Sequence, residues 1–308
     1  MATLTLLVGC ARPTPGRVIV VVTVDWEGAE LSADGLDALD DLRHKLGPVP
    51  VTHFVSAAYF TKPHADPAAA TTIGRAIRAD DELAVHLHAW RSLVGASGVT
   101  AKLSPSFLTG TDQLLAFADG DAGFDTDLDA YSVAELRAML RTSRQLLART
   151  GRPVSQAFRA GGYLGTPKLV QAIADEGFTV DSSAIAPRQL DERPDAVLSQ
   201  RLAEVWPGLE PSARPWHARP GVLELPIAAL ADYATSDQLA GAITAAQARL
   251  QAAPRRDVIV VIGCHLETAS DFALRLADAI AKVPDRAQLM FATVSGAAAR
   301  IHGARGPE

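Results

Sequence analysis

The stretch that decides the fold is Arg17-Val-Ile-Val-Val-Val-Thr-Val24, in which seven β-forming residues follow one arginine. An uninterrupted apolar run of this kind is typical of a strand buried on both faces, as in a parallel sheet. The next periodic segment, 36–46, places leucines on one stripe and charged residues on the other, which predicts an amphipathic helix. A buried strand followed by a helix is the first unit of an α/β architecture.

Strands and helices continue to alternate along the chain. Further strands are predicted at 51–57, 82–87, 156–159, 178–181, 222–227, 258–263 and 290–294. Further helices are predicted at 72–78, 132–150, 167–176, 236–251 and 271–282. One unbroken series of such units predicts a single domain, a distorted (β/α) barrel over residues 17–300, with its active site at the carboxyl ends of the strands. Segment 91–131 lacks periodicity and is predicted to lie over that active face, whereas 186–221 is predicted to be irregular.

Composition excludes several classes of protein. The 308 residues are 48% hydrophobic and 21% charged, which excludes intrinsic disorder. The net charge of -6 is not that of a nucleic-acid binder. Two cysteines exclude a disulfide framework and a multi-thiolate zinc site. No apolar run approaches the ~20 residues that a transmembrane helix needs. The sequence leaves the oligomeric state open.

The two ends lie outside the predicted barrel. Residues 1–16 form a leader whose Leu-Val-Gly-Cys10 ending resembles a bacterial lipoprotein processing site, although the charged region of an export signal is missing. The interpretation therefore favours a cytoplasmic protein and keeps a cell-envelope lipoprotein as the alternative. Residues 301–308 are a predicted C-terminal tail.

Polar residues collect where the predicted strands end. Asp25 and Glu27 are two residues apart after the first strand, so they point to the same side. His86 and His88 share one side in the same way. Buried carboxylates need a partner or a metal, and carboxylate with imidazole is a ligand set that suits zinc and other divalent ions. His265 ends another buried run, and Arg159 and Asp181 also lie at strand ends.

Six segments, in this order, resemble the polysaccharide deacetylases of the NodB-homology type. They are Thr23-Val-Asp25-Trp-Glu27-Gly28, Val51-Thr-His-Phe-Val55, Glu82-Leu-Ala-Val-His86, Phe158-Arg159-Ala-Gly-Gly-Tyr163, Gly177-Phe-Thr-Val-Asp181 and Ile262-Gly-Cys-His265-Leu266. The resemblance implies a bacterial hydrolase of amide bonds that removes acetyl groups from N-acetylated or O-acetylated oligo- or polysaccharide. It also implies a divalent cofactor, zinc first, with cobalt and nickel as further candidates.

The resemblance also implies a role for each matching residue. Asp25 is expected to be the general base, held ionised by Arg159, and His265 the general acid, tuned by Asp181. Glu27, His86 and His88 are the expected metal ligands. Tyr163 and Trp90 are expected at the substrate and the oxyanion.

One departure from the family pattern and one further resemblance keep other functions open. The second metal-binding histidine is expected at the position of Trp90, so His88 must replace it or the metal site is lost. A barrel without a working metal site would be a carbohydrate-binding protein. Asp25-Trp26-Glu27 also resembles the acidic strand of chitinase-type glycoside hydrolases, but the preceding strand residues are not acidic and that function would not explain the histidines.

Overall fold

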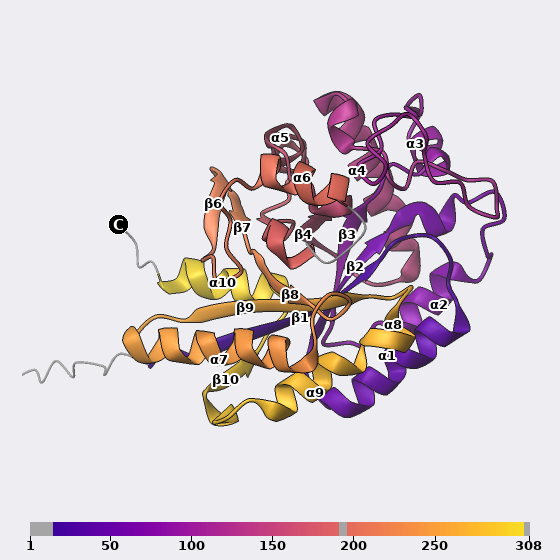
Figure 1. Ribbon diagram of the computed structural model, residues 1–308. Helices are drawn as coiled ribbons and strands as arrows, with labels where there is room; N and C mark the ends of the chain where they lie inside the picture. Colours follow the sequence, from indigo (N-terminus) through magenta and orange to yellow (C-terminus); the bar gives the residue numbers. More distant parts are fainter. Residues whose placement is uncertain (1–14, 191–195, 305–308) are drawn as a thin grey trace, which may run out of the picture.

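The computed structural model describes residues 15–190 and 196–304. Over these ranges ten strands form one sheet in the order β6-β7-β5-β4-β3-β2-β1-β9-β8, with β10 paired to the start of β1 (Figure 1). The strands are β1 (Val18–Trp26), β2 (Val51–Ser56), β3 (Glu82–Leu87), β4 (Val154–Ala160), β5 (Val180–Asp181), β6 (Trp216–Arg219), β7 (Val222–Glu224), β8 (Ile227–Leu230), β9 (Val258–His265) and β10 (Leu289–Phe291). Only β6 pairs antiparallel to its neighbour.

Most helices cover the outside of the sheet. The helices are α1 (Ala33–Leu46), α2 (Ala69–Ala76), α3 (Arg91–Ala96), α4 (Val133–Leu147), α5 (Pro167–Asp175), α6 (Ala196–Val205), α7 (Ser236–Ala252), α8 (Ala269–Phe272), α9 (Leu274–Lys282) and α10 (Val294–Ala304). Of these, α6 and α10 instead pack against the core inside the curl of the sheet. Helix α4 begins with a capping box, because the Ser132 hydroxyl accepts from the Glu135 N–H and the Glu135 side chain accepts from the Ser132 N–H. Such a cap contributes about 1 kcal/mol to the stability of the helix.

Strand β1 separates two apolar cores. All nine of its residues are buried. Val18, Val20 and Val22 belong to the core between the sheet and the helices, whereas Ile19 and Val21 belong to the core inside the curled sheet. Burying one such side chain stabilises the fold by roughly 1.5–3 kcal/mol. The same alternation directs the odd-numbered residues at the end of β1 into the interior.

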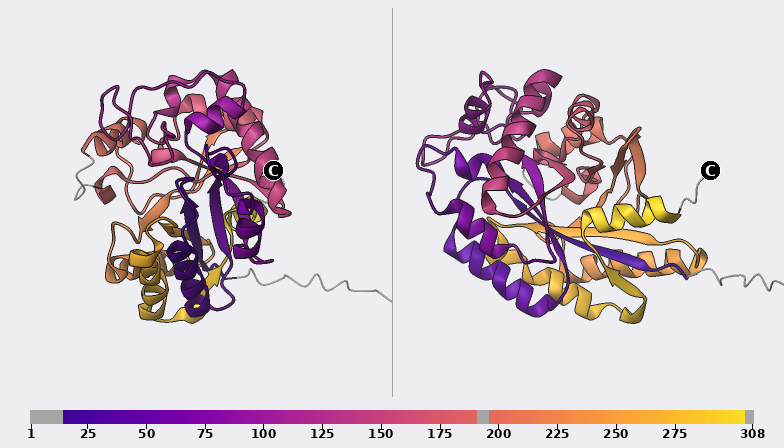
Figure 2. Two further views of the ribbon diagram at one scale, coloured as in Figure 1. Left: turned by 90° about the vertical axis from the view of Figure 1, so that its right-hand side faces the viewer. Right: turned by 180° about the vertical axis from the view of Figure 1, so that it is seen from behind.

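The sheet curls into a barrel that is closed by one bridge. Ile185, which follows β5, pairs with Ile227 at the start of β8, so the edge strand β8 is linked back to the segment after β5. Figure 2 shows the curl of the sheet from two further sides. The predicted distorted α/β barrel in a single domain is therefore confirmed.

Three segments differ from the sequence-based prediction. Residues 186–221, predicted to be irregular, contain α6 and β6. The strand predicted at 222–227 is two strands, because Pro226 has no N–H for the sheet and separates β7 from β8. The last predicted strand ends at Phe291, and Val294 already begins α10.

The predicted leader lies almost wholly outside the described residues. Structure is described only from Pro15 onward, so Cys10 and the lipoprotein interpretation lie outside it, as do residues 305–308 of the predicted tail. In the part of the chain that is described, no helix is both long and apolar enough to cross a membrane.

Candidate active site

The acidic pair of β1 lies inside the barrel, at the carboxyl end of the strand. Asp25 is fully buried, and the Glu27 side chain is 11% exposed. Trp26, between them, points to the opposite side and packs in the outer core. The spacing of two residues therefore brings both carboxylates into the same interior space, as predicted.

Glu27 contacts two histidines at the end of β3, His86 and His88. Its Oε1 lies 3.3 Å from Nε2 of His86, and its Oε2 lies 2.6 Å from Nε2 of His88. The two Nε2 atoms are 3.2 Å apart. The structure thus gathers the three predicted metal ligands at one point, with one ligand atom from each.

The Nδ1 atoms of the two histidines determine which ring nitrogen faces Glu27. Nδ1 of His86 lies 3.0 Å from the Arg159 carbonyl, and Nδ1 of His88 lies 2.7 Å from the Phe124 carbonyl. Because a carbonyl only accepts, both Nδ1 atoms carry hydrogen, so Nε2 is the atom of each imidazole that can bind a metal. Burial raises the pKa of the Glu27 carboxyl, but the charged forms of the neighbouring His88 and His86 outweigh burial and hold it well below its usual range. The cluster therefore favours a positive charge beside Glu27, and its ligand set fits a divalent metal.

Asp25 is held by hydrogen bonds from two sides. Its Oδ1 accepts from Nη1 of Arg159 at 2.6 Å, and Oδ2 accepts from the Tyr163 hydroxyl at 3.2 Å. The same guanidinium donates to the Thr23 hydroxyl at 2.9 Å. Because the side chains of Arg159 and Asp25 are fully buried, each charge depends on the other. The predicted pairing of these two residues is present.

His265 is oriented by a carboxylate that differs from the predicted one. Its Nδ1 lies 3.1 Å from Oδ2 of Asp232, and its Nε2 faces Oε1 of Glu27 at 3.4 Å. Burial lowers the pKa of His265, but the carboxylates of Asp232 and Glu27 raise it well above its ordinary value. The predicted tuning by Asp181 is corrected accordingly, because Asp232, two residues after β8, occupies that place.

Asp181 supports the loops beneath the site. It accepts from the Ser183 hydroxyl, which in turn accepts from the N–H of Ala160 at 2.9 Å. Its other partner is Glu224, whose Oε1 accepts from the N–H of Ala184 at 2.9 Å. Burial and the proximity of Asp181 raise the pKa of Glu224 well above its usual value, and burial raises the pKa of Asp181 to about 6. The two carboxyls are therefore close enough to share a proton.

Tyr163 and Trp90, the two residues predicted at the substrate and the oxyanion, both lie at this site, Tyr163 among the gathered side chains and Trp90 beneath them. The Tyr163 hydroxyl contacts Nε2 of His265 at 2.7 Å as well as Asp25, so it joins the predicted acid to the predicted base. Trp90 is fully buried, and its Nε1 donates to the carbonyl of Glu27 at 2.8 Å. Trp90 is therefore a support beneath the metal ligand and not a substrate contact, because no part of it reaches the surface.

Glu267 and Tyr59 also support the site, and neither was among the predicted residues. Both carboxylate oxygens of Glu267 accept from the N–H of Glu27, at 3.0 and 3.2 Å, and Oε1 accepts from the Tyr59 hydroxyl at 2.7 Å. Burial and the charge of Glu27 raise the pKa of Glu267 to about 7. Glu267 follows His265 by two residues, so the strand-end argument could have found it, whereas Asp232 lies two residues after β8 and beyond the strand predicted at 222–227.

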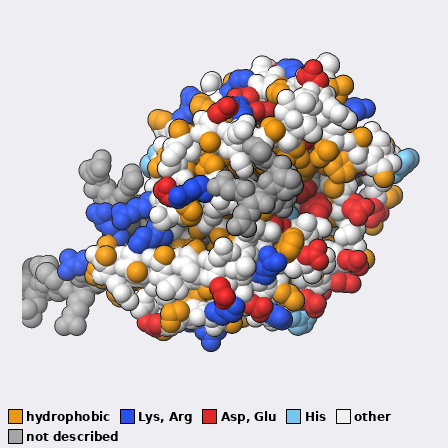
Figure 3. All heavy atoms as spheres, in the orientation of Figure 1, with side chains coloured by type: hydrophobic (Ala, Val, Ile, Leu, Met, Phe, Trp, Pro, Cys, Tyr) orange, Lys and Arg blue, Asp and Glu red, His pale blue; other side chains and the backbone are white. Residues whose placement is uncertain are grey.

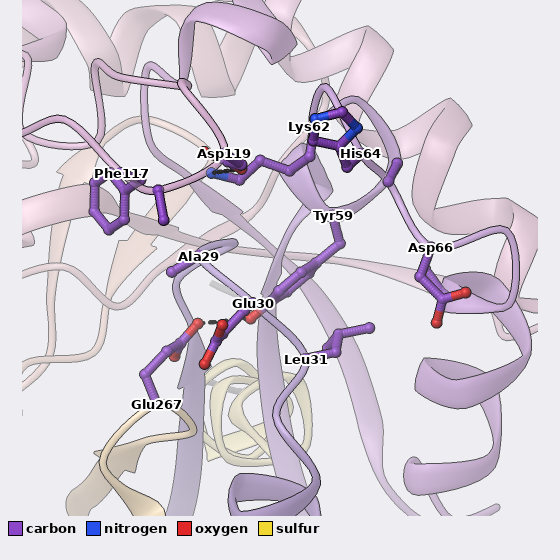
Figure 4. Close-up of a pocket in the computed structure, with 13 residues that line it drawn as sticks. Ala29, Glu30, Leu31, Tyr59, Lys62, His64, Asp66, Phe117, Asp119 and Glu267 are labelled. Carbon is purple, nitrogen blue, oxygen red and sulfur yellow. Dashed lines mark hydrogen bonds and ion pairs between the residues drawn. The ribbon is translucent and has the colours of Figure 1, made fainter.

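A cavity of about 620 Å³ opens beside this network (Figure 4). Tyr59 and Glu267 meet at its floor, and Phe117 and Asp119 reach it from the segment that was predicted to lie over the active face. The same segment contacts a predicted metal ligand, because the Phe124 ring stacks on His88 with a centroid distance of 4.3 Å. The segment thus borders both the cavity and the predicted metal site.

Solved structures share this fold. A structure from Mycobacterium smegmatis, provisionally assigned as a polysaccharide deacetylase, matches with a TM-score of 0.54 and 16% identity, over 99% of this chain and 100% of that one. The structure of Puue allantoinase matches with a TM-score of 0.54 and 14% identity, over 100% of both chains. No family model matches the chain, and no curated protein does. The chain therefore has the fold of the NodB-type deacetylase structures, as the sequence motifs predicted.

Proposed function

We propose that the protein is a metal-dependent hydrolase that removes acetyl groups from acetylated carbohydrate. The observation that carries this proposal is the convergence of His86 and His88 on the Glu27 carboxylate, directly beside Asp25 and His265. The group combines a metal-ligand set, a buried carboxylate and a carboxylate-backed imidazole. Metal-assisted acyl transfer to water uses such a combination.

Glu27, His86 and His88 would hold the cation, with zinc preferred for a ligand set of nitrogen and carboxylate oxygen. A divalent cation there would supply Lewis acidity, which makes a water more acidic and a carbonyl more electrophilic. The carbonyls of Arg159 and Phe124 fix the tautomers of the two imidazoles, so Nε2 of each is the ligand atom.

The remaining residues move the protons. Asp25 accepts the proton of the attacking water at a carboxylate oxygen, and Arg159 keeps that carboxylate ionised. His265 donates a proton from Nε2 to the leaving amine, and Asp232 stabilises the imidazolium. The Tyr163 hydroxyl lies between the two and passes a proton from base to acid after each turnover. Positioned acid and base groups each contribute roughly 10²–10⁴-fold to a rate.

The cavity beside Glu267 suits a sugar chain. It presents the aromatic side chains of Tyr59 and Phe117 together with polar groups such as Glu30 and Asp119. Sugars pack their C–H faces on aromatic rings and hydrogen-bond through their hydroxyls, and a cleft of this size takes a small ligand. We therefore place further units of an acetylated oligo- or polysaccharide in this cavity.

Metal content and acetate release test the proposal together. The purified protein is stripped with a chelator, reconstituted with zinc, cobalt or nickel, and assayed on N-acetylated chito-oligosaccharide and on O-acetylated xylan. We expect one metal ion per chain and acetate release that depends on it. His88→Ala should lose both, whereas His44→Ala, an exposed residue of α1, should keep both. A protein that binds sugar but takes up no metal would instead be the carbohydrate-binding alternative.

Allantoin is the second substrate to assay. The allantoinase structure matches this fold as well as the deacetylase structure does, with a TM-score of 0.54 for each. The same base, acid and metal ligands would hydrolyse a small cyclic amide. Ring opening of allantoin without acetate release would favour this second candidate over the first.

A further inference from the structure

A second cavity lies at the opposite end of the barrel, where β1 and β9 begin. Its volume is about 640 Å³. It is separated from His265 by the length of β9, about 20 Å at roughly 3.3 Å per residue. Five arginines line it, namely Arg214, Arg249, Arg255, Arg256 and Arg300. Figure 3 shows Lys and Arg side chains gathered at the left-hand end of the molecule, where Figure 1 shows these strands to begin.

Nearby carboxylates do not neutralise this positive charge. Asp257 is the one acidic residue among the described residues that line the cavity, and its oxygens are already engaged. Oδ1 accepts from the N–H of Arg17 at 2.8 Å, and Oδ2 accepts from Nε of Arg300 at 2.7 Å. Arg255 and Arg256 are exposed and form no ion pair within the described ranges. The charge is thus concentrated locally in a chain whose net charge is -6.

Arg249 indicates that the cavity is built for a ligand. Its Nη1 donates to the Ser212 carbonyl at 2.7 Å, which fixes the guanidinium, while its buried Nε has no hydrogen-bond partner in the described structure. Burial lowers the pKa of Arg249, and the charge of Arg214 lowers it further. A buried donor without a partner and like charges held together both cost free energy, and a bound anion relieves both.

We propose that this cavity binds a phosphate-bearing anion, at a site separate from the candidate active site. The planar guanidinium matches two phosphate oxygens, and several guanidiniums match a group that carries more than one negative charge. Val258, Ile259 and Ile301 add an apolar floor for the uncharged part of such a ligand.

Two sources of phosphate fit the place of this cavity in the chain. The N–H of Gly16 donates to the carbonyl of Pro254 at 2.8 Å, so the polypeptide enters the barrel at the rim of the cavity. The residues before it in sequence include the apolar run 4–8. A membrane-attached leader would bring phospholipid headgroups to the arginines, whereas a free protein would take a soluble phosphate compound.

Binding measurements with two probes distinguish these sources. Inorganic pyrophosphate is titrated calorimetrically into the full chain, and vesicles of phosphatidylcholine, alone or mixed in equal parts with phosphatidylglycerol, are tested by flotation. Binding of pyrophosphate alone identifies a soluble ligand. Flotation with only the mixed vesicles identifies a lipid headgroup. Binding of neither probe overturns the proposal.

The double variant Arg255→Gln with Arg256→Gln tests whether the cavity is responsible. Both side chains are exposed and hold no structural contact within the described residues, so the fold is retained. Affinity for the probe that binds should fall at least about tenfold for each arginine removed.

The matched control is Arg75→Gln with Arg91→Gln, a double variant on α2 and α3 that changes the net charge by the same amount. An equal loss in both double variants overturns the proposal, because it reports net charge alone. Acetate release should be unchanged in both, which separates this test from that of the proposed function.

Discussion

Nδ1 of His265 lies 3.1 Å from Oδ2 of Asp232, a carboxylate that is 2% exposed and lies two residues after the neighbouring strand. The second oxygen of this carboxylate accepts from the Thr268 hydroxyl. The aspartate therefore has a fixed position, and it holds the imidazole with Nε2 turned toward Glu27 and Tyr163. Asp232 is the positioning residue for the proposed acid.

The first prediction concerns this carboxylate. Asp232→Asn keeps the shape of the side chain but removes the charge that stabilises the imidazolium. The kcat for acetate release should fall about 10²-fold, at the lower end of what a positioned acid contributes. Bound metal per chain should stay the same, because Asp232 is not one of the gathered ligands. The exposed Asp271→Asn is the control, and loss of metal in Asp232→Asn would contradict the assignment.

The second prediction concerns the hydroxyl of Tyr163. Tyr163→Phe keeps the buried ring and removes the contacts with Asp25 at 3.2 Å and His265 at 2.7 Å. We expect kcat to fall by about 10-fold to 10²-fold with little change in KM, because the hydroxyl acts between the base and the acid and not on the ground-state substrate. Tyr131→Phe is the control, because it removes another buried hydroxyl, one that accepts from the N–H of Lys102 and contacts neither Asp25 nor His265. Unchanged kcat in Tyr163→Phe would exclude a relay through this residue.

Much of the fold could be predicted from the sequence because buried parallel strands carry a strong signal. The run 17–24 forms most of β1, and because alternate residues of a strand point to the same side, Asp25 and Glu27 lie in one interior space. The break at Pro226 and the strand β6 were not predicted. Pro226 is a local break inside an apolar run, and β6 has only four residues and pairs with its neighbour β7, so periodicity alone does not reveal it.

The candidate site was predictable where one motif holds both partners and less so where partners come from different strands. His86 lies near the end of β3 and His88 directly follows the strand, so their convergence follows from the spacing of two. Asp181 ends a strand and Asp232 lies two residues after one, and sequence alone does not tell which of them faces His265. The register of β8 against β9 decides it, because Leu230 pairs with Gly263 and brings Asp232 alongside His265. The burial of Trp90 likewise follows from the packing of the insert.

The third prediction concerns the aromatic support of a metal ligand. Phe124 stacks on His88 with a centroid distance of 4.3 Å and an interplanar angle of 9°. Phe124→Ala keeps the carbonyl that accepts from Nδ1 but frees the imidazole to tilt. Zinc affinity, measured by competition with a chelator, should fall about 10-fold to 10²-fold, as for other residues that orient metal ligands. Phe117→Ala is the matched control, because Phe117 belongs to the same insert but packs on Trp90. An equal loss of affinity in both variants would show that the insert acts only through its general order.

The fourth prediction concerns the shared proton of Asp181 and Glu224. Burial raises the pKa of Asp181 to about 6, and burial with the neighbouring Asp181 raises that of Glu224 well above its usual value. A carboxyl whose pKa is higher in the folded than in the unfolded protein contributes stability at pH values below its unfolded pKa. That stability is lost as the pH rises through the folded pKa. The contribution of this pair to the stability of the fold should therefore be lost as the pH rises from about 4, the unfolded value, through the folded pKa of Asp181 at about 6. Glu224→Gln removes one of the two ionisable groups and keeps an acceptor for the N–H of Ala184, so its stability should depend less steeply on pH in that range. Urea unfolding at several pH values measures the pH dependence of stability. The control is Glu204→Gln, because Glu204 is exposed and far from this pair in sequence. Parallel pH profiles for the wild type and Glu224→Gln would mean that the two carboxyls do not share a proton.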